Sequence, residues 1–307
     1  MHQDSHQSNP ISQRSSMTTA ANIDKRINRG QFYDAHQVLT SYISRLTARG
    51  KRDEAASLCA DFALKFAAKE QYGLTADLAI TLIDLWKEEA DRLPCVTAER
   101  LETIVALFQA CPPHSTKEKY RFINKAIKWT STTPLEGQEG AESPYPNGHP
   151  MLHTAAGKAY WAEKDFGSAQ LHLVFGKDGC DLAAMVREWQ PEAYPSEAPL
   201  FPLRTTLMVL SMNDIPTAVT FVESLIGSDL DDPGLPPALQ AAYLLAEACR
   251  LNDWDFFLMV QTKYQLVLRR DPSFARYLEV IKGDVFGVKD ANASGGLMGM
   301  LSNLLQG

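Results

Sequence analysis

The stretches GQFYDA (Gly30–Ala35) and GKRDEA (Gly50–Ala55) decide the fold of this chain. In each, a turn-forming or polar residue starts a new helix and a small residue follows five positions later. The same offset recurs in QYGLTA (Gln71–Ala76), KDFGSA (Lys164–Ala169) and NDIPTA (Asn213–Ala218). In paired-helix repeats, the turn residue ends one helix and the alanine lets two helices approach closely. The pattern predicts an all-α fold, a right-handed TPR-like α-solenoid of paired antiparallel helices, and such chains usually hold other proteins.

Composition narrows the class of protein further. A chain of 307 residues that is 45% hydrophobic can bury a substantial core, while its net charge of −7 argues against nucleic-acid binding. No stretch approaches the ~20 apolar residues of a membrane span, and the polar N-terminus is no secretory signal. The five cysteines are scattered without a CxxC pair, which favours buried reduced thiols and a cytoplasmic protein.

The chain is expected to divide into five parts. Residues 1–21 are polar and predicted to be disordered, and residues 132–148 form an acidic loop rich in proline and glycine between two helical halves. Between residues 228 and 237, the sequence predicts an irregular excursion or a small ribbon. The predicted boundaries are 1–21, 22–131 (N-terminal helical half), 132–148, 149–288 (C-terminal helical half) and 289–307 (flexible tail).

The sequence contains no catalytic signature. Walker, dinucleotide-binding, zinc-protease and nucleophile-elbow patterns are all missing, so no enzyme activity and no cofactor are expected. His149 and His153 have the four-residue spacing of metal ligands on a helix. However, Pro150 puts His149 at the cap, so packing or capping is the favoured role and no metal site is predicted.

Basic residues are concentrated near the N-terminus. Within residues 25–52 the only acid is Asp34, while seven residues are basic: Lys25, Arg26, Arg29, Arg45, Arg49, Lys51 and Arg52. Arg45 and Arg49 are one helical turn apart, and Arg26 and Arg29 share a face of the preceding helix. Two interpretations stay open, namely an ordinary solvated face or one patch that binds an acidic protein surface.

The segment 254–268 is unusually rich in apolar and aromatic side chains, from Trp254 to Leu268. A helix that is apolar around its whole circumference is either fully buried or covered by a partner. Both interpretations stay open at this stage.

From GQFYDAHQ (Gly30–Gln37) onward the sequence resembles the Golgi to ER traffic protein 4 family, helical-repeat adaptors of the guided-entry (GET) pathway for tail-anchored membrane proteins. The resemblance continues through KAIKWTS (Lys125–Ser131), GHPMLH (Gly148–His153) and AYWAEKDFGSAQLHLVFG (Ala159–Gly176). It closes with LRRDPSFARYLEVI (Leu268–Ile281), FGV (Phe286–Val288) and GGLMGML (Gly295–Leu301). It covers nearly everything after residue 22, and a fungal source is expected.

The resemblance implies a non-enzymatic adaptor. Its N-terminal half would dock on the dimeric targeting ATPase and restrain ATP hydrolysis, and its C-terminal half would hold the N-terminal segment of a ubiquitin-like partner. The ATPase-binding residues expected on this basis are Lys25, Arg26, Arg29, Tyr33, His36, Arg45, Arg49 and Arg52. Within TADL (Thr75–Leu78), Asp77 would be regulatory, although an acid near a helix start is also favoured by the helix dipole. The ubiquitin-like partner would contact Trp254, Phe257, Met259, Tyr264 and Leu266.

A second hypothesis from a different class stays open. The chain could be a helical scaffold subunit of another cytosolic assembly, with the basic patch incidental. Binding of nucleic acid and direct insertion into a membrane are not expected under either hypothesis.

Overall fold

The computed structural model describes residues 10–88, 95–138, 142–227 and 234–288 of the chain, which divides into two compact units at Pro144 and Tyr145. The division lies inside the segment expected to connect the two halves. The described residues are helical and contain no β-strand, so the all-α prediction is confirmed. The expected ribbon and the tail fall on 228–233 and 289–307, outside the described residues.

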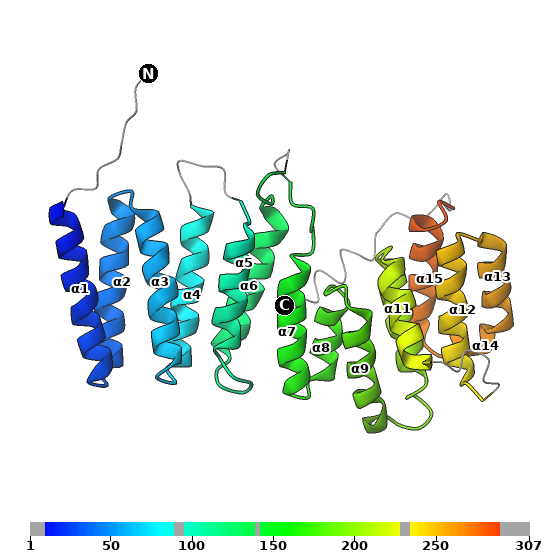
Figure 1. Ribbon diagram of the computed structural model, residues 1–307. Helices are drawn as coiled ribbons and strands as arrows, with labels where there is room; N and C mark the ends of the chain where they lie inside the picture. The colour runs from blue at the N-terminus through cyan, green and yellow to red at the C-terminus, as the bar shows by residue number, and fades with distance from the viewer. Residues whose placement is uncertain (1–9, 89–94, 139–141, 228–233, 289–307) are drawn as a thin grey trace, which may run out of the picture. The chain divides into compact units, whose positions relative to one another are not determined.

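Among its described residues, the first unit contains six helices in antiparallel order (Figure 1). Their bounds are α1 Pro10–Asn28, α2 Phe32–Ala48, α3 Arg52–Ala67, α4 Tyr72–Lys87, α5 Ala98–Gln109 and α6 Glu118–Thr132. Helix α1 begins at Pro10, so residues 10–21, which were expected to be disordered, are helical. Good helix formers such as Gln13, Arg14 and Met17 follow a proline at the first helical position, where proline is well tolerated.

The second unit contains the remaining helices. Their bounds are α7 Pro150–Ala162, α8 Phe166–Leu173, α9 Gly179–Trp189, the 3-10 helix η1 Gln190–Glu192, α10 Leu200–Ser211, α11 Ile215–Ile226, α12 Pro237–Leu251, α13 Trp254–Lys263, α14 Gln265–Leu268 and α15 Pro272–Asp284. The single helix predicted near 256–269 is broken at Tyr264, where the hydroxyl donates to Gln240 Oε1 on α12 at 2.9 Å. The ring is thereby held against α12 while the chain turns into α14.

One turn joins helices in both units. A residue with left-handed φ between 51° and 76° is followed by one residue and then by the first residue of the next helix. The residue after it donates its backbone N–H to the carbonyl five positions earlier, which is the Schellman arrangement. Six residues meet both conditions, with left-handed φ and this hydrogen bond: Gly30, Gly50, Glu70, Lys164, Asn213 and Asn252.

This turn explains the five-residue offset in the sequence. Five positions after each left-handed residue stands a side chain with no exposed surface: Ala35, Ala55, Thr75, Ala169, Ala218 and Phe257. The expected stretch Gln71–Ala76 is one residue late, because Glu70 is the left-handed residue and Thr75 the equivalent buried position. Phe257 shows that the position does not always require a small residue.

The segment between α6 and α7 is partly ordered rather than a plain acidic loop. Val96 and Leu135 form an isolated parallel bridge, in which Val96 N donates to Pro134 O at 2.8 Å and Glu136 N donates to Val96 O at 3.0 Å. Ser143 Oγ donates to Thr130 O at 2.6 Å. Pro134 and Glu136 are therefore tied by backbone hydrogen bonds to Val96 before α5, and Ser143 is tied to Thr130 of α6.

Candidate protein-binding site

The basic residues predicted to bind the ATPase lie at two opposite ends of α2. Lys25, Arg26 and Arg29 lie at the α1–α2 turn, and Arg45, Arg49 and Arg52 at the α2–α3 turn, at the other end of the helices in Figure 1. At 1.5 Å per residue, the 17-residue helix α2 separates these turns by ~25 Å. The expectation of one continuous basic patch is therefore wrong, because adjacency in sequence hides the length of the helix.

We call the first group the α1–α2 cluster and define it as Lys25, Arg26, Arg29, Tyr33 and His36. Tyr33 is among the most exposed large side chains, with 79% of its surface accessible. Lys25 and Arg29 are exposed, and neither forms an ion pair within the described residues. The cluster therefore presents two free cations and an aromatic ring to solvent.

The second group, the α2–α3 cluster, consists of Arg45, Arg49 and Arg52. Arg45 is exposed, but its Nε donates to the Ser41 carbonyl at 3.2 Å and its guanidinium lies 5.7 Å from the centre of the Tyr42 ring. The Arg45 guanidinium therefore already interacts with Ser41 and Tyr42 of its own helix. The acidic residues Asp53 and Glu54 begin α3 next to this cluster and reduce its net charge.

Asp77 and His36, expected as regulatory and binding residues, are brought together by the fold. His36 Nε2 on α2 lies 3.0 Å from Asp77 Oδ2 on α4. The His36 ring also meets the buried Phe66 of α3 edge-on, with ring centres 6.0 Å apart. Although the distance is that of an ion pair, the ring N–H is not aligned for a hydrogen bond. The carboxylate therefore lies in close contact with the imidazole without a hydrogen bond from it.

The position of Asp77 weakens its explanation as a helix-start acid. Helix α4 begins at Tyr72, and no acidic residue lies in its first turn. The favourable effect of the helix dipole falls off within that turn. Asp77 also lies near the buried thiol of Cys59, whose pKa is raised to about 12, mainly by burial and secondly by the Asp77 charge.

In the second unit, the apolar segment 254–268 divides into a core side and an exposed side. Phe257 and Tyr264 are buried, and Trp254 is half-buried between Phe257 and Phe286. The prediction that Phe257 and Tyr264 contact a partner is therefore wrong, because they pack inside the unit.

Met259 and Leu266 remain candidates, with 59% and 79% of their surfaces accessible. Sequence reasoning missed Leu251 and Leu258, which are also exposed and lie near them in sequence. Only the solvent-accessible fraction of their side chains identifies them as candidates, and the sequence alone does not give that fraction. We call Leu251, Leu258, Met259 and Leu266 the C-terminal apolar surface.

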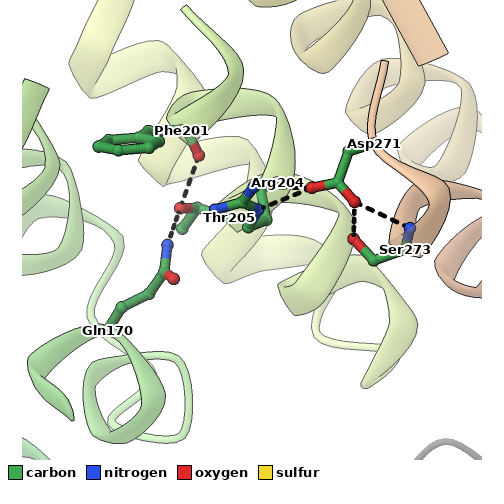
Figure 2. A network of polar contacts seen from close by, with 6 residues as sticks. All are labelled: Gln170, Phe201, Arg204, Thr205, Asp271 and Ser273. Carbon is green, nitrogen blue, oxygen red and sulfur yellow. Dashed lines mark hydrogen bonds and ion pairs between the residues drawn. The ribbon is translucent and has the colours of Figure 1, made fainter. Parts of the chain in front are cut away.

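A polar network in the second unit involves residues of α8, α10 and the start of α15 (Figure 2). Asp271 caps the N-terminus of α15 by accepting from Ser273 N and Oγ, and it also accepts from Arg204 of α10 at 2.7 Å. Partial burial acts to raise the pKa of Asp271, but these donors outweigh it and lower that pKa below its usual value. Nearby, Gln170 of α8 donates to Thr205 Oγ1 at 2.5 Å.

The two histidines of the GHPMLH segment have structural roles, one as a helix cap and one as a buried, hydrogen-bonded side chain. His149 caps α7 by accepting from Met151 N, as expected for a residue before Pro150. His153 points inward, with Nδ1 3.2 Å from His172 Nδ1 and Nε2 2.9 Å from the Asn147 carbonyl. The described residues hold no group of three metal-ligating side chains around either histidine or elsewhere. A search of the same residues finds no helix that is both long and apolar enough to cross a membrane.

The fold defines the class of protein as an all-α helical-repeat protein. A solved structure, the crystal structure of C. therm. Get4, has the same fold, with a TM-score of 0.77 at 24% identity over 94% of this chain and 95% of that chain. The all-α solenoid predicted from the sequence is thereby confirmed.

The family follows from sequence comparison. The family model of Golgi to ER traffic protein 4 matches residues 49–305, and the chain belongs to this family. It is 29% identical to the Golgi to ER traffic protein 4 homolog of Xenopus tropicalis and 28% identical to that of Homo sapiens, in each case over 92% of this chain and 84% of the relative. Membership supports a role in the GET pathway, and the family is one of adaptor scaffolds.

Proposed function

We propose that this protein is a cytosolic, non-enzymatic adaptor that bridges a ubiquitin-like co-chaperone partner to the targeting ATPase for tail-anchored proteins and restrains ATP hydrolysis by that ATPase. The observation that carries the proposal is the chemical difference between its two units. The first unit exposes cations around the α1–α2 turn, and the second exposes an apolar surface on α12–α14. Two surfaces of different chemistry on separate units suit two different partners.

The ATPase is assigned to the first unit. Exposed cations facing an acidic surface give fast association that weakens with ionic strength. The separation of the basic residues into two clusters allows each to be tested alone. Arg26→Glu/Arg29→Glu reverses charge in the α1–α2 cluster, and Arg45→Glu/Arg49→Glu reverses it in the α2–α3 cluster.

We expect each double variant that removes an anchoring cluster to weaken ATPase binding by more than about tenfold, which corresponds to ~1.4 kcal/mol. Lys128→Glu on the exposed face of α6 is the matched control, since it makes a charge reversal outside both clusters. Binding measured at increasing salt should weaken for the wild type. If both double variants bind as the wild type does, the basic residues are ordinary solvated side chains.

Asp77 is assigned to regulation rather than to affinity. A carboxylate beside cations is poorly suited to attract the acidic surface that those cations bind. It can instead meet a basic group of the ATPase that moves during the cycle, which shifts the ATPase between states without adding much affinity. Asp77→Lys should therefore leave binding within a few-fold and relieve the restraint on ATP hydrolysis. ATP turnover at saturating adaptor is the measurement, and equal restraint by wild type and variant would remove this role.

The ubiquitin-like partner is assigned to the C-terminal apolar surface, helped at its edge by the half-buried Trp254. Apolar contacts are not screened by salt, so the complex should survive about 1 M salt. Met259→Asp/Leu266→Asp should abolish binding, whereas Leu64→Asp, at an exposed apolar residue of the first unit, should not. Dissociation of the wild-type complex by salt would show that this interface is not apolar.

A further inference from the structure

We propose that His36 is a positioning residue, whose role is to hold the Asp77 carboxylate in the orientation in which the ATPase meets it. The inference rests on the regulatory role proposed for Asp77. It changes the role expected for His36, which was grouped with the residues that contact the ATPase directly. The contact that carries it is the 3.0 Å separation of His36 Nε2 and Asp77 Oδ2.

Exposure assigns different roles to the two side chains. The His36 side chain is 17% accessible, whereas that of Asp77 is 59% accessible. A partner approaching this surface therefore meets the carboxylate and finds little of the imidazole to bind. One turn earlier on α2, Tyr33 presents its ring to solvent and is better placed for direct contact. His36 thus acts on a partner through Asp77.

The His36 imidazole is itself held in place by packing against Phe66 on the side facing the core. Its edge-on contact with Phe66 comes from α3, and the Phe66 side chain is fully buried in the core of the first unit. The three residues come from three consecutive helices, α2, α3 and α4. Because α2 also carries Tyr33 beside the α1–α2 turn, a partner that shifts the start of α2 would move the His36 ring relative to Asp77.

The contact also leaves the carboxylate free to change partner. The ring N–H of His36 is not aligned on Asp77 Oδ2, and within the described residues the carboxylate has no other ion pair. Asp77 is therefore held next to the imidazole by a 3.0 Å contact without being saturated by hydrogen bonds. A cation of the ATPase could take the carboxylate in one state of its cycle and return it to His36 in another, which is the differential contact that regulation requires.

The test compares His36→Leu with His36→Gln. Leucine keeps an apolar contact with Phe66 but has no donor, whereas glutamine places an amide N–H near the position of the imidazole Nε2. We expect His36→Leu to relieve the restraint on ATP hydrolysis by at least half as much as Asp77→Asn does, with binding of the ATPase within about threefold of the wild type. His36→Gln should retain most of the restraint. A role in packing alone would not distinguish the two variants in this way.

A second measurement reports the pair without the ATPase. In protein with ¹³C-labelled histidine, Asp77→Asn should shift the His36 ring resonances, and Asp61→Asn on the exposed face of α3 should not. Unshifted His36 resonances in Asp77→Asn would overturn the pairing. If Asp77→Asn relieves the restraint and His36→Leu does not, the positioning role fails while the regulatory role of Asp77 stands. If Asp77→Asn has no effect on hydrolysis, the regulatory role fails, and the inference with it.

Discussion

Acidification from pH 7 to pH 5 is expected to destabilise the second unit through the buried pair His153 and His172. His153 Nε2 faces the Asn147 carbonyl at 2.9 Å, so it carries the proton and donates. His153 Nδ1 is then an acceptor, and His172 Nδ1–H donates to it across 3.2 Å. Both rings are neutral in this arrangement. A second proton on His153 would go to Nδ1 and put two donors face to face, whereas one on His172 would go to Nε2 and place an unpaired charge in the same buried site, which lies between Tyr160 and Phe175.

The magnitude follows from the pKa values. Burial lowers the pKa of His153 from 6.5 to about 4, against the hydrogen bond to the Asn147 carbonyl, which raises it, and His149 lowers it further. Burial lowers the pKa of His172 from 6.5 to about 3, and His153 adds to this effect. Because the folded pKa values are depressed, the unfolded chain binds protons below pH 6.5 that the folded chain does not. Stability is therefore complete above pH 6.5 and is lost as the pH falls from there toward 3. Between pH 7 and pH 5 the loss is ~2 kcal/mol for each histidine and ~4 kcal/mol for the pair.

Urea unfolding at the two pH values, with hydrogen exchange of α7 and α8 peptides, measures this loss. His172→Gln keeps a donor toward His153 but does not titrate, so it should halve the loss to ~2 kcal/mol. His114→Asn, at an exposed histidine in the first unit, should leave it unchanged. The lowered pKa of Asp271 acts only below its usual 3.8, outside this window. A His172→Gln protein that loses as much stability as the wild type would refute the assignment of neutral, mutually bonded rings.

Three further predictions concern the turns and the packing, all measured by thermal or urea unfolding. Glu70→Gly should stabilise the first unit by ~1 kcal/mol and Gly50→Ala should destabilise it by a similar amount, because both positions have left-handed φ, where a Cβ is strained. Gly179→Ala should lower the free energy of unfolding by ~3 kcal/mol, since the new Cβ would lie 2.6 Å from Phe221 N and 2.7 Å from Thr217 O. Gly283→Ala is the control, because the space around Gly283 is open and the substitution should not destabilise α15. Arg204→Met should cost ~2 kcal/mol by leaving Asp271 without its cation, and an unchanged midpoint would show that the capping bonds of Ser273 suffice.

The sequence was sufficient to predict most of the helices, because turn chemistry and apolar spacing are local, but it missed the helix over 10–21 and the break at Tyr264. It also located the join between the units. The turn at Glu70 was placed one residue late because glutamate seldom adopts left-handed φ, so no local signal marked it.

The site was harder to predict, because it depends on where helices meet. His36 and Asp77 are far apart in sequence, and only the packing of α2, α3 and α4 brings them together. Apolar character alone did not distinguish Phe257, which is buried, from Met259, which is exposed two positions later. Basic residues that are close in sequence were assigned to one patch, although α2 holds them at opposite ends.

The repeated Schellman turn also limits how the chain can vary in length. It leaves one residue between the left-handed position and the next helix, so the start of each such helix is set by the end of the one before. One inserted residue would turn the following helix by ~100° about its axis and bring a different row of side chains to the core. The join from Pro112 to Lys117 and the join from Ala193 to Pro199 lack this turn. Insertions and deletions among relatives should therefore accumulate at such joins, while the distance between successive turns stays constant.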